Sequence, residues 1–456
     1  MSEEGLRAGV EKMRSEGVAE AAIRAFEHYY RQLEAGETGL MPEASIEPVT
    51  DPVEFDELPS DPGAERDALQ KAIVLRLNGG LGTSMGLSRA KSVLEAKDGL
   101  SFLDIIARQV LALREAHDAR LPLVLMDSFS TRDDSLAALS EHPGLDVGLP
   151  LDFLQNKEPK LLVDGLTPAS WPDDPGLEWC PPGHGDLYTA LVTSGMLESL
   201  LERGFEYAFM ANSDNLGAVL DTRILAWMRA ENVPFAMEVT DRTEADRKGG
   251  HIARRRSDGR LVLRETAQTP KEDLAALQDI GRHRYVNTNN LWISLRALDA
   301  AMRERDGVLG LPMIRNAKTV DPSDKSSPAV YQIETAMGAA IEVFEGARAL
   351  RVPRRRFAPV KTTDDLLALR SDAYELTADA RVVLAGDRTT VPFVALDPDY
   401  FKLLRDFEER FPDGPPSLVA CDRFEVEGDV RFGAGVVARG DVKLTGPRTV
   451  EDGAEL

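Results

Sequence analysis

The sequence has little cysteine, a deficit of positive charge and no long apolar run. Its two cysteines, Cys180 and Cys421, are far apart, which excludes a disulfide framework and favours a reducing, intracellular setting. Lys and Arg total 54 against 77 Asp and Glu, a net charge of -23, which argues against a general nucleic-acid-binding surface. No apolar run approaches membrane-spanning length, and the acidic start MSEEGLRAGVEKM lacks the apolar core of a secretory signal. We therefore expect a cytoplasmic protein that binds neither nucleic acid nor membrane.

The central region of the chain predicts alternating strands and helices. The 456 residues suffice for two or three domains, and the 43% of hydrophobic residues can fill a large core. The expected strands are 73–77, 121–126, 207–211 and 235–238. The expected helices are 102–117, 130–140 with a serine cap, 187–203 and 222–231. This alternation predicts an α/β fold with a mostly parallel sheet covered on both faces.

The two ends of the chain differ from this central region, residues 61–390. Residues 1–60 predict a helical arm, with a break at Gly17 between two helices, and then an irregular connection that begins near residue 41. Residues 391–456 predict one helix at 400–411, followed by valines that recur every four to six residues between glycines. This spacing is compatible with a few coils of β-helix, and an edge β-meander fits about as well. We expect this region to serve packing or assembly.

The glycine-rich loop at residues 78–86 is the most informative stretch. Four glycines after a buried strand permit positive φ and leave no Cβ to block a ligand. Several backbone N–H groups can then face one anion, and Lys91 just beyond adds a full charge. The spacing fits neither the Rossmann dinucleotide fingerprint nor the P-loop. The loop predicts a phosphate site of another type, with a glycine-rich surface turn as the alternative.

Two further loops carry polar side chains next to predicted elements. His184 stands just before a helix, where it suits hydrogen bonding to an anion or a sugar hydroxyl, or else satisfies a turn carbonyl. Asp214 follows the strand 207–211, and a carboxylate there fits a Mg²⁺ site completed by substrate phosphates and water, or else caps a turn. Because no histidine or cysteine ligand set accompanies them, a hard metal is preferred and zinc is not expected.

Clustered amides and one basic run complete the candidate features. Residues 247–250 allow close backbone approach, and the amides of residues 287–290 suit a polyhydroxylated ligand. Residues 351–361 form the densest basic run, either a solvated face or a phosphate site with Lys361 as the favoured position. No nucleophilic triad is visible. That absence matters little for phosphoryl-type transfer, where positioning and charge dominate.

Six motifs in order resemble the eukaryotic-type UTP–glucose-1-phosphate uridylyltransferases, also called UDP-glucose pyrophosphorylases. They are LNGGLGTSMG at 77–86 with Lys91 and Ser92, PPGHGD at 181–186, DNLG at 214–217, KGG at 248–250, NTNNLWISL at 287–295 and VPRRRFAPVKTT at 352–363. The resemblance covers roughly residues 43–369. N-acetylhexosamine pyrophosphorylases usually carry Ala-Gly-Gly where this chain has Asn78, Gly79 and Gly80, so the resemblance favours glucose.

The resemblance implies a Rossmann-like nucleotidyltransferase domain that makes UDP-glucose and pyrophosphate, reversibly and with Mg²⁺, from UTP and glucose 1-phosphate. The implied nucleotide-binding residues are Leu77, Gly79, Gly80, Gly82, Thr83, Gln155, Gly183 and His184. The implied sugar-binding residues are Asn212, Gly250, Glu265, Asn289 and Phe357. Lys91, Lys361 and Asp214 would be catalytic, with Asp214 also holding the metal.

Two features depart from the family pattern. Ala90 stands where the family usually has proline, which loosens the approach to Lys91. The C-terminal portion, expected to be a short left-handed β-helix-like domain, is shorter than the β-helix through which eukaryotic members assemble. The oligomeric state therefore stays open, with a homo-oligomer through this domain as a hypothesis. The alternatives to the implied activity are a broader UDP-sugar pyrophosphorylase and a catalytically silent nucleotide-sugar-binding module.

Overall fold

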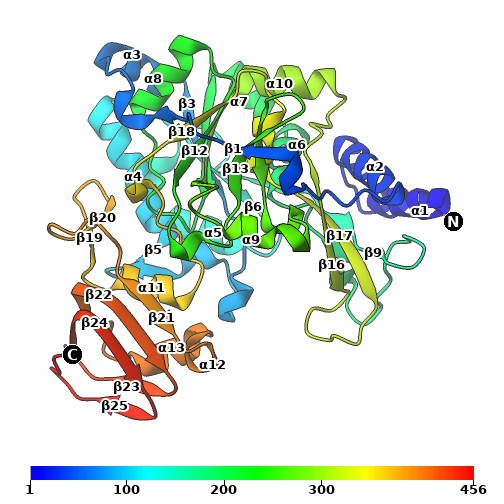
Figure 1. Cartoon of the computed structure of the whole chain (residues 1–456). Coiled ribbons are helices and arrows are strands. Elements are labelled where there is room, and N and C mark those ends of the chain that lie inside the picture. The colour runs from blue at the N-terminus through cyan, green and yellow to red at the C-terminus, as the bar shows by residue number, and fades with distance from the viewer. Residues whose placement is uncertain (1) are drawn as a thin grey trace. The chain divides into compact units, whose positions relative to one another are not determined.

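The apolar run ahead of the glycine-rich loop forms the strand β3, Ala72–Leu77, and all of its side chains up to Arg76 are buried. The computed structural model describes residues 2–456, and Figure 1 shows their helices and strands. The chain forms two compact units, each built from segments that are distant in the sequence. The first contains the residues up to Leu75, Phe153–Met210 and Asp221–Val352. The second contains Arg76–Asp152, Ala211–Leu220 and Pro353–Leu456.

A mixed sheet forms the centre of the first unit. Its strands are β1 Ile46–Pro48, β2 Val53–Glu54, β11 Tyr207–Asn212, β12 Phe235–Asp241, β13 His251–Arg255, β14 Leu261–Arg264, β15 Tyr285–Ser294 and β18 Arg348–Arg351, together with β3. The order is β2-β18-β12-β15-β11-β3, and β13 pairs with β1, β14 and β15. β15 runs antiparallel to β11 and β12, whereas β2, β18 and β12 are parallel neighbours. The predicted α/β class with a mostly parallel central sheet is confirmed.

The helices of the first unit include the two predicted on either side of Gly17. The helices are α1 Ser2–Ser15, α2 Glu20–Glu34, α3 Pro62–Leu69, α6 Leu187–Thr193, α7 Met196–Glu202, α8 Thr222–Glu231, α9 Leu274–Gln278 and α10 Leu295–Glu304. α8 has the predicted bounds. The prediction of one helix over 187–203 is wrong, because Gly195, at φ +74°, separates α6 from α7.

The N-terminal helices share a core with a small antiparallel sheet of the first unit. This sheet has the order β16-β17-β9, with β9 Leu161–Leu162, β16 Met313–Thr319 and β17 Ala329–Thr335. Met13, Phe26 and Tyr30 of the helices are buried in one cluster with Leu161 and Ile333 of the sheet. A two-stranded sheet, β8 Glu158–Pro159 with β10 Trp179–Cys180, lies in the same unit. The arm is therefore anchored by apolar burial, the main stabilising term in packing of this kind.

The first segment of the second unit begins at Arg76, within β3. Its first elements are β4 Glu95–Lys97, β5 Leu100–Ser101, α4 Phe102–His117, β6 Leu123–Asp127 and α5 Arg132–Ser140, and this segment ends at Asp152, the first residue of β7 Asp152–Leu154. α4 has the predicted bounds and begins with a capping box between Ser101 and Asp104. The predicted serine cap of the next helix is wrong. Thr131 occupies the N-cap position of α5, and its hydroxyl bonds to Asp127 and Ser128 instead of capping the helix.

The C-terminal part of the second unit is built from parallel strands. Its elements are α11 Thr363–Arg370, β19 Tyr374–Leu376, β20 Val382–Leu384, β21 Phe393–Leu396, α12 Pro398–Phe401, α13 Leu404–Arg410, β22 Ser417–Glu427, β23 Val430–Phe432, β24 Val437–Thr445 and β25 Arg448–Val450. The predicted single helix at 400–411 is wrong, because Leu403 is extended between α12 and α13. β21, β22 and β24 are parallel neighbours, and so are β23 and β25. This parallel pairing excludes the antiparallel meander.

Within residues 2–456, no helix combines the length and the apolar character that crossing a membrane requires.

Candidate functional site

The glycine-rich loop of the second unit folds back on Lys91. Gly82 and Gly86 have φ of +66° and +74°, and they flank the short 3-10 helix Thr83–Met85. The backbone N–H of Lys91 donates to the carbonyl of Gly80 at 3.2 Å. A Cβ at Gly82 would stand 3.3 Å from the Cβ of Lys91, so glycine permits this close approach. The loop and the lysine therefore form one local structure.

Ala90 keeps the backbone geometry that a proline would impose. Its φ is -53°, within the range of proline, so the approach to Lys91 is retained. Its backbone N–H donates to Asp134 Oδ2 at 3.3 Å, a bond that proline could not make. The departure from the family pattern is thus compensated by a hydrogen bond to α5.

Asn78 fixes the base of the loop from inside the second unit. Its side chain is 4% exposed and donates to Asp127 Oδ1 at 2.7 Å and to Ser135 Oγ at 2.6 Å. Its backbone N–H donates to the carbonyl of Met126 at 2.8 Å. Next to it, Ser128 Oγ donates to the carbonyl of Gly79 at 3.0 Å. The asparagine is therefore a structural anchor of the loop.

Asp127 at the end of β6 receives these bonds and is itself fully buried. Burial raises the pKa of Asp127 to about 6, although the hydrogen bonds from Asn78 and Ser135 oppose the shift. Among the residues that the structure describes, its Oδ2 has no hydrogen-bond partner. The sequence reasoning missed Asp127. Its hydrogen-bond partner Asn78 lies 49 residues away in the sequence, and no local motif indicates the pair.

Lys91 and Asp214 form an ion pair beside the basic segment. Lys91 Nζ lies 2.9 Å from Asp214 Oδ2 and also donates to the carbonyl of Val360. Val360 N–H in turn donates to the carbonyl of Asp214 at 3.0 Å. The structure therefore brings Lys91 and Asp214 together, with Lys361 one residue beyond. The ammonium-bearing side chain of Lys361 is exposed.

Asp214 has the donor set for a divalent cation that draws most of its ligands from a substrate. Its Oδ1 is buried and has no hydrogen-bond partner in the part of the chain that the structure describes. No group of three or more His, Cys, Asp or Glu side chains within residues 2–456 could hold a metal. A carboxylate oxygen without a partner suits a hard cation such as Mg²⁺, whose remaining ligands are phosphates and waters. The residues present fit such a metal.

Asn215 and Gly217 hold the basic segment that carries Phe357. Asn215 Oδ1 accepts the N–H of Ala358 at 2.9 Å, and Asn215 Nδ2 donates to the carbonyl of Arg356 at 3.3 Å. A Cβ at Gly217 would stand 2.6 Å from the carbonyl oxygen of Arg355, so glycine is required for this contact. The segment is therefore bound to the loop that carries Asp214. Sequence reasoning missed this role of Asn215.

Not all of the basic run is available to an anion. Arg351, in the first unit, forms ion pairs with Asp241 and Glu54, and these raise its pKa. The guanidinium of Arg354 lies 5.1 Å from the ring centroid of Phe357. The side chain of Arg356 is buried, so its charge contributes little at the surface.

In the first unit, the loop before α6 holds Gly183 and His184 against β17. Gly183 has φ +79°, and a Cβ there would stand 2.6 Å from the carbonyl oxygen of Thr335. His184 Nδ1 accepts the backbone N–H of Met337 at 3.0 Å, so in the neutral ring the proton lies on Nε2. His184 begins a 3-10 helix, His184–Asp186, ahead of α6. The ring of His184 is therefore held in a fixed orientation.

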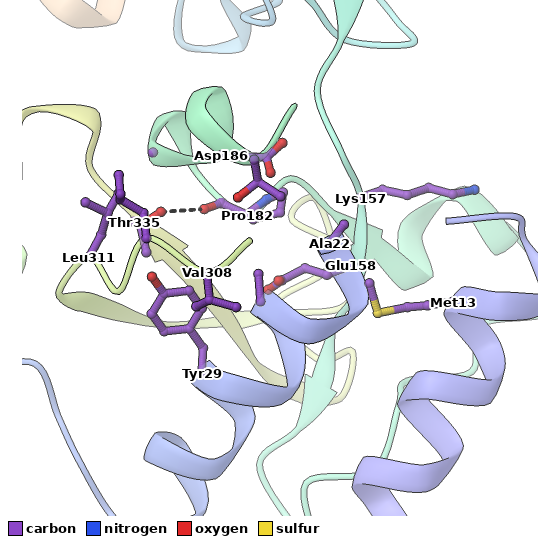
Figure 2. A pocket seen from close by; sticks show the side chains of 14 residues that line it. Met13, Ala22, Tyr29, Lys157, Glu158, Pro182, Asp186, Val308, Leu311 and Thr335 are labelled. Atoms are coloured by element: carbon purple, nitrogen blue, oxygen red, sulfur yellow. Dashed lines mark hydrogen bonds between the residues drawn. The ribbon is translucent and has the colours of Figure 1, made fainter. Parts of the chain in front are cut away.

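A small cavity lies behind this loop, between it and the N-terminal helices (Figure 2). Its volume is about 30 Å³, and Tyr29, Glu158, Asp186 and Thr335 are among the lining residues. Burial raises the pKa of Asp186 to about 6, and Asn156 donates to its carboxylate from the backbone at 2.6 Å and from the side chain at 2.8 Å. This volume holds water but no nucleotide. The cavity is therefore not the substrate site.

The residues implied to bind sugar in the first unit are Gly250, Glu265 and Asn289. A Cβ at Gly250 would stand 2.4 Å from Glu265 Oε2, so the glycine and the carboxylate are in direct contact. Asn289 has φ +57° and accepts a hydrogen bond from Asn287 Nδ2 at 2.7 Å. Asn290 is buried and donates to Glu238. The amide cluster is therefore partly structural, with Asn289 left half-buried.

The predicted residues divide between the two units. The second unit contains Leu77, Gly79, Gly80, Gly82, Thr83, Lys91, Asn212, Asp214, Phe357 and Lys361. The first contains Gln155, Gly183, His184, Gly250, Glu265 and Asn289. Asn212 ends β11, and Gln155 is a half-buried residue just after β7.

The mixed α/β sheet, with a glycine-rich loop after β3, is consistent with a Rossmann-like nucleotidyltransferase. The sequence pattern of the UTP–glucose-1-phosphate uridylyltransferases matches residues 23–439. The chain belongs to this family.

Individual relatives are similar to this chain over most of its length. It is 40% identical to the UTP–glucose-1-phosphate uridylyltransferase of Solanum tuberosum over 406 residues, covering 88% of this chain and 83% of that protein. It is 38% identical to that of Hordeum vulgare over 465 residues, covering 99% and 95%. A mutant UDP-glucose pyrophosphorylase from Leishmania major in complex with UDP-glucose has a TM-score of 0.93 at 48% identity, covering 99% of this chain and 98% of that one. The structure of the UDP-glucose phosphorylase of Trypanosoma brucei has a TM-score of 0.93 at 44% sequence identity, again covering 99% of this chain and 98% of that one.

Proposed function

We propose that the protein catalyses reversible uridylyl transfer, in which UTP and glucose 1-phosphate give UDP-glucose and pyrophosphate. The observation that carries the chemistry is the Lys91–Asp214 pair next to the glycine-rich loop. Asp214 Oδ1 has no hydrogen-bond partner within residues 2–456, and Lys91, whose cation pairs with Asp214, also contacts the glycine-rich loop. Such an arrangement suits a polyphosphate.

In our mechanism the sugar phosphate attacks directly. Its oxygen is already an anion at neutral pH, so no general base is needed. It attacks the α-phosphorus of UTP in line, and the bond from that phosphorus to the departing pyrophosphate breaks. Two polyanions repel each other, and Lys91 and Lys361 lower this barrier. Loop N–H groups would hold the leaving phosphates.

Asp214 would hold the divalent metal that nucleotidyltransferases of this family generally need, and we propose Mg²⁺. When bound, the metal would neutralise charge on the phosphate oxygens. The chain's own contribution is to orient Asp214, through the ion pair with Lys91 and the backbone bond to Val360.

The remaining residues would select the two substrates. We assign the binding of UTP to Leu77, Gly79, Gly80, Gly82, Thr83, Gln155, Gly183 and His184. We assign the glucosyl group to Asn212, Gly250, Glu265, Asn289 and Phe357. Supporting the second set, Glu265, Asn289 and Asn212 offer the donors and acceptors that sugar hydroxyls require.

For the rest of the molecule we propose three parts in chain order: a helical arm and connection at 1–60, the catalytic domain at 61–390 and a C-terminal domain at 391–456. Phe424 pairs with Val442 and Val430 with Arg448, and both pairs are separated by 18 residues. This offset of 18 residues supports a short left-handed β-helix-like domain, since three hexapeptide repeats make one coil. A cytoplasmic location, and a homo-oligomer through this domain, are further proposals.

One assay tests the function. Pyrophosphate release is measured with the purified protein over a panel of nucleotides and sugar 1-phosphates. The proposal requires release with UTP and glucose 1-phosphate above all other pairs. Equal rates with galactose 1-phosphate would indicate a broader UDP-sugar pyrophosphorylase, and release with no pair would indicate a silent binding module.

A further inference from the structure

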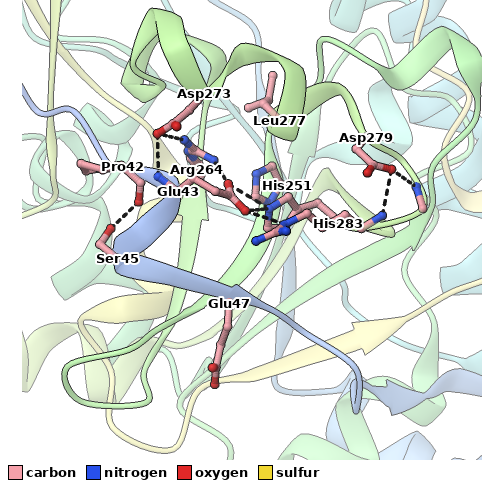
Figure 3. Close-up of polar contacts among 12 residues, drawn as sticks. Pro42, Glu43, Ser45, Glu47, His251, Arg264, Asp273, Leu277, Asp279 and His283 are labelled. Carbon is pink, nitrogen blue, oxygen red and sulfur yellow. Dashed lines mark hydrogen bonds and ion pairs between the residues drawn. The ribbon is translucent and has the colours of Figure 1, made fainter.

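A buried polar cluster joins the N-terminal connection of the first unit to β13 and β14 (Figure 3). We name it the Glu43 cluster, and it contains Glu43, His251, Arg264, Asp273, His283 and Arg282, whose Nε donates to Glu43 Oε1 at 2.7 Å. Glu43 Oε1 accepts from His283 Nε2 at 2.9 Å, and Glu43 Oε2 accepts from Arg264 Nη1 at 2.5 Å. Arg264 Nη2 also donates to Asp273 Oδ2 at 3.3 Å. Both histidines and Arg264 are buried.

The cluster lies directly behind two residues assigned to the sugar. His251 and Arg264 are paired across β13 and β14. Gly250 immediately precedes His251, and Glu265 immediately follows Arg264. The ring of His251 stacks on that of His283, with 3.8 Å between centroids. A shift of either buried side chain would therefore displace the backbone of Gly250 or Glu265.

The same connection is tied to the loop on the other side of Glu265. The N–H of Met41 donates to the carbonyl of Gln268 at 2.7 Å, and Gln268 Oε1 accepts the N–H of Glu265 at 3.1 Å. The N–H of Glu43 donates to Asp273 Oδ2 at 2.7 Å. Residues 41–43 thus hold both the strand before Glu265 and the turn after it.

Charge makes Glu43 the residue on which the cluster depends. A buried guanidinium is costly unless it is paired, and Arg264 is fully buried. Burial lowers the pKa of His283, so its ring is neutral near pH 7 and its Nε2–H donates to Glu43. Burial alone would raise the pKa of Glu43, but the hydrogen bonds from His283 and Arg264 hold it below its ordinary value. Glu43 therefore supplies a negative charge to Arg264, with Asp273 as the weaker second partner.

We propose that Glu43 is a positioning residue for glucose 1-phosphate. Through Arg264 and His251 it fixes the separation of Glu265 and Gly250, and so the pocket for the glucosyl group. The inference rests on the proposed function and on the sugar assignment of these two residues. It adds a residue outside every recognised motif of the sequence.

The test compares Glu43→Gln with a matched control in the same connection, Glu47→Gln. Glu47 has a side chain 46% exposed, pairs with Arg256 at 3.1 Å and points away from the cluster in Figure 3. KM for UTP and KM for glucose 1-phosphate are measured separately, with thermal melting to confirm the fold. We expect Glu43→Gln to raise KM for glucose 1-phosphate about tenfold, as a small misplacement of a binding group does, with KM for UTP unchanged. Glu47→Gln should leave both constants unchanged.

A second variant keeps the inference testable if Glu43→Gln does not fold. Glu43→Asp retains the charge but is one methylene too short to reach His283 and Arg264 together, so a smaller rise in the same KM is expected. A folded variant with an unchanged KM for glucose 1-phosphate would overturn the inference. Equal rises in both KM values would also overturn it, because they indicate general loosening. Lack of activity in the wild-type protein would instead overturn the proposed function, and that outcome is seen before any variant is compared.

Discussion

Replacing Asp127 with asparagine should change how the stability of the protein depends on pH. The carboxyl is fully buried at the base of the glycine-rich loop, and burial raises its pKa to about 6 from the ordinary 3.8. The folded protein therefore binds this proton more tightly than the unfolded chain does. The stabilisation is fully present below about pH 3.8 and is lost as the pH rises to about 6. Above that pH, folding requires a buried carboxylate whose Oδ2 has no hydrogen-bond partner within residues 2–456.

The size of the effect follows from the two pKa values. A difference between 3.8 and about 6, at about 1.36 kcal/mol for each pH unit, corresponds to about 3 kcal/mol of lost stability above pH 6. About half of that, roughly 1.4 kcal/mol, is lost between about pH 5 and about pH 7.5. Asp127→Asn retains an acceptor for Asn78 but places an amide N–H₂ where Oδ2 lacks a partner, which costs about 1–3 kcal/mol. That cost is independent of pH. The informative quantity is therefore the slope, against pH, of the difference in stability between Asp127→Asn and wild type.

Urea unfolding at several pH values measures how the free energy of unfolding of each protein changes with pH. The stability of Asp127→Asn relative to wild type should rise by about 1–2 kcal/mol between about pH 5 and about pH 7.5. Asp186 and Asp364 also have pKa values raised to about 6 by burial, but they are present in both proteins and cancel in the difference. Asp133→Asn, on the exposed face of α5, is the control and should show no slope. A difference between Asp127→Asn and wild type that stays constant with pH would refute the reasoning.

Three further predictions concern activity. Lys361→Ala should lower turnover at least about a hundredfold, as loss of a charge contact in the transition state does, and pyrophosphate release measures it. Lys402→Ala, which removes another exposed lysine of the second unit, is its control, and wild-type turnover in folded Lys361→Ala would remove Lys361 from the mechanism. Asp214→Asn should keep its fold by circular dichroism and lose Mg²⁺-dependent activity in a metal titration; an unchanged metal response would exclude Asp214 as the ligand. Gly250→Ala should raise KM for glucose 1-phosphate at constant KM for UTP, because its Cβ would stand 2.4 Å from Glu265 Oε2, and an unaltered KM would contradict that contact.

Local patterns predicted those parts of the fold that local physics determines. The helices α4 and α8 have the predicted bounds, because each combines helical periodicity with a clear N-terminal cap, Ser101 and Asp221 respectively. The errors fall where one residue overrides periodicity. Gly195 interrupts the predicted helix at 187–203, and extended Leu403 interrupts that at 400–411. The glycine was a readable signal, whereas nothing in the local sequence marks Leu403.

In the candidate site, too, the features that neighbouring residues determine were predictable, and those that depend on residues far along the chain were not. Positive φ at Gly82 and close packing at Gly183 are properties of a short segment, and glycine predicts them. The support of the site depends on partners far along the chain. Asn215 holds Ala358 from 143 residues away, and Glu43 reaches His283 from 240 residues away. Such pairs leave no periodic trace in a single sequence.

Asn78 illustrates how a family marker and a physical role can differ. In the sequence it distinguishes this chain from the N-acetylhexosamine enzymes, which invites the interpretation that its amide selects glucose. In the structure the amide is 4% exposed and is occupied by Asp127 and Ser135, so it is turned away from any ligand. Any effect on substrate choice must then pass through the backbone at Gly79, which Ser128 holds at its carbonyl. Asn78 therefore distinguishes the two families through the way in which the loop is anchored. Asp127, which no sequence motif indicates, accepts the hydrogen bond that completes this anchor.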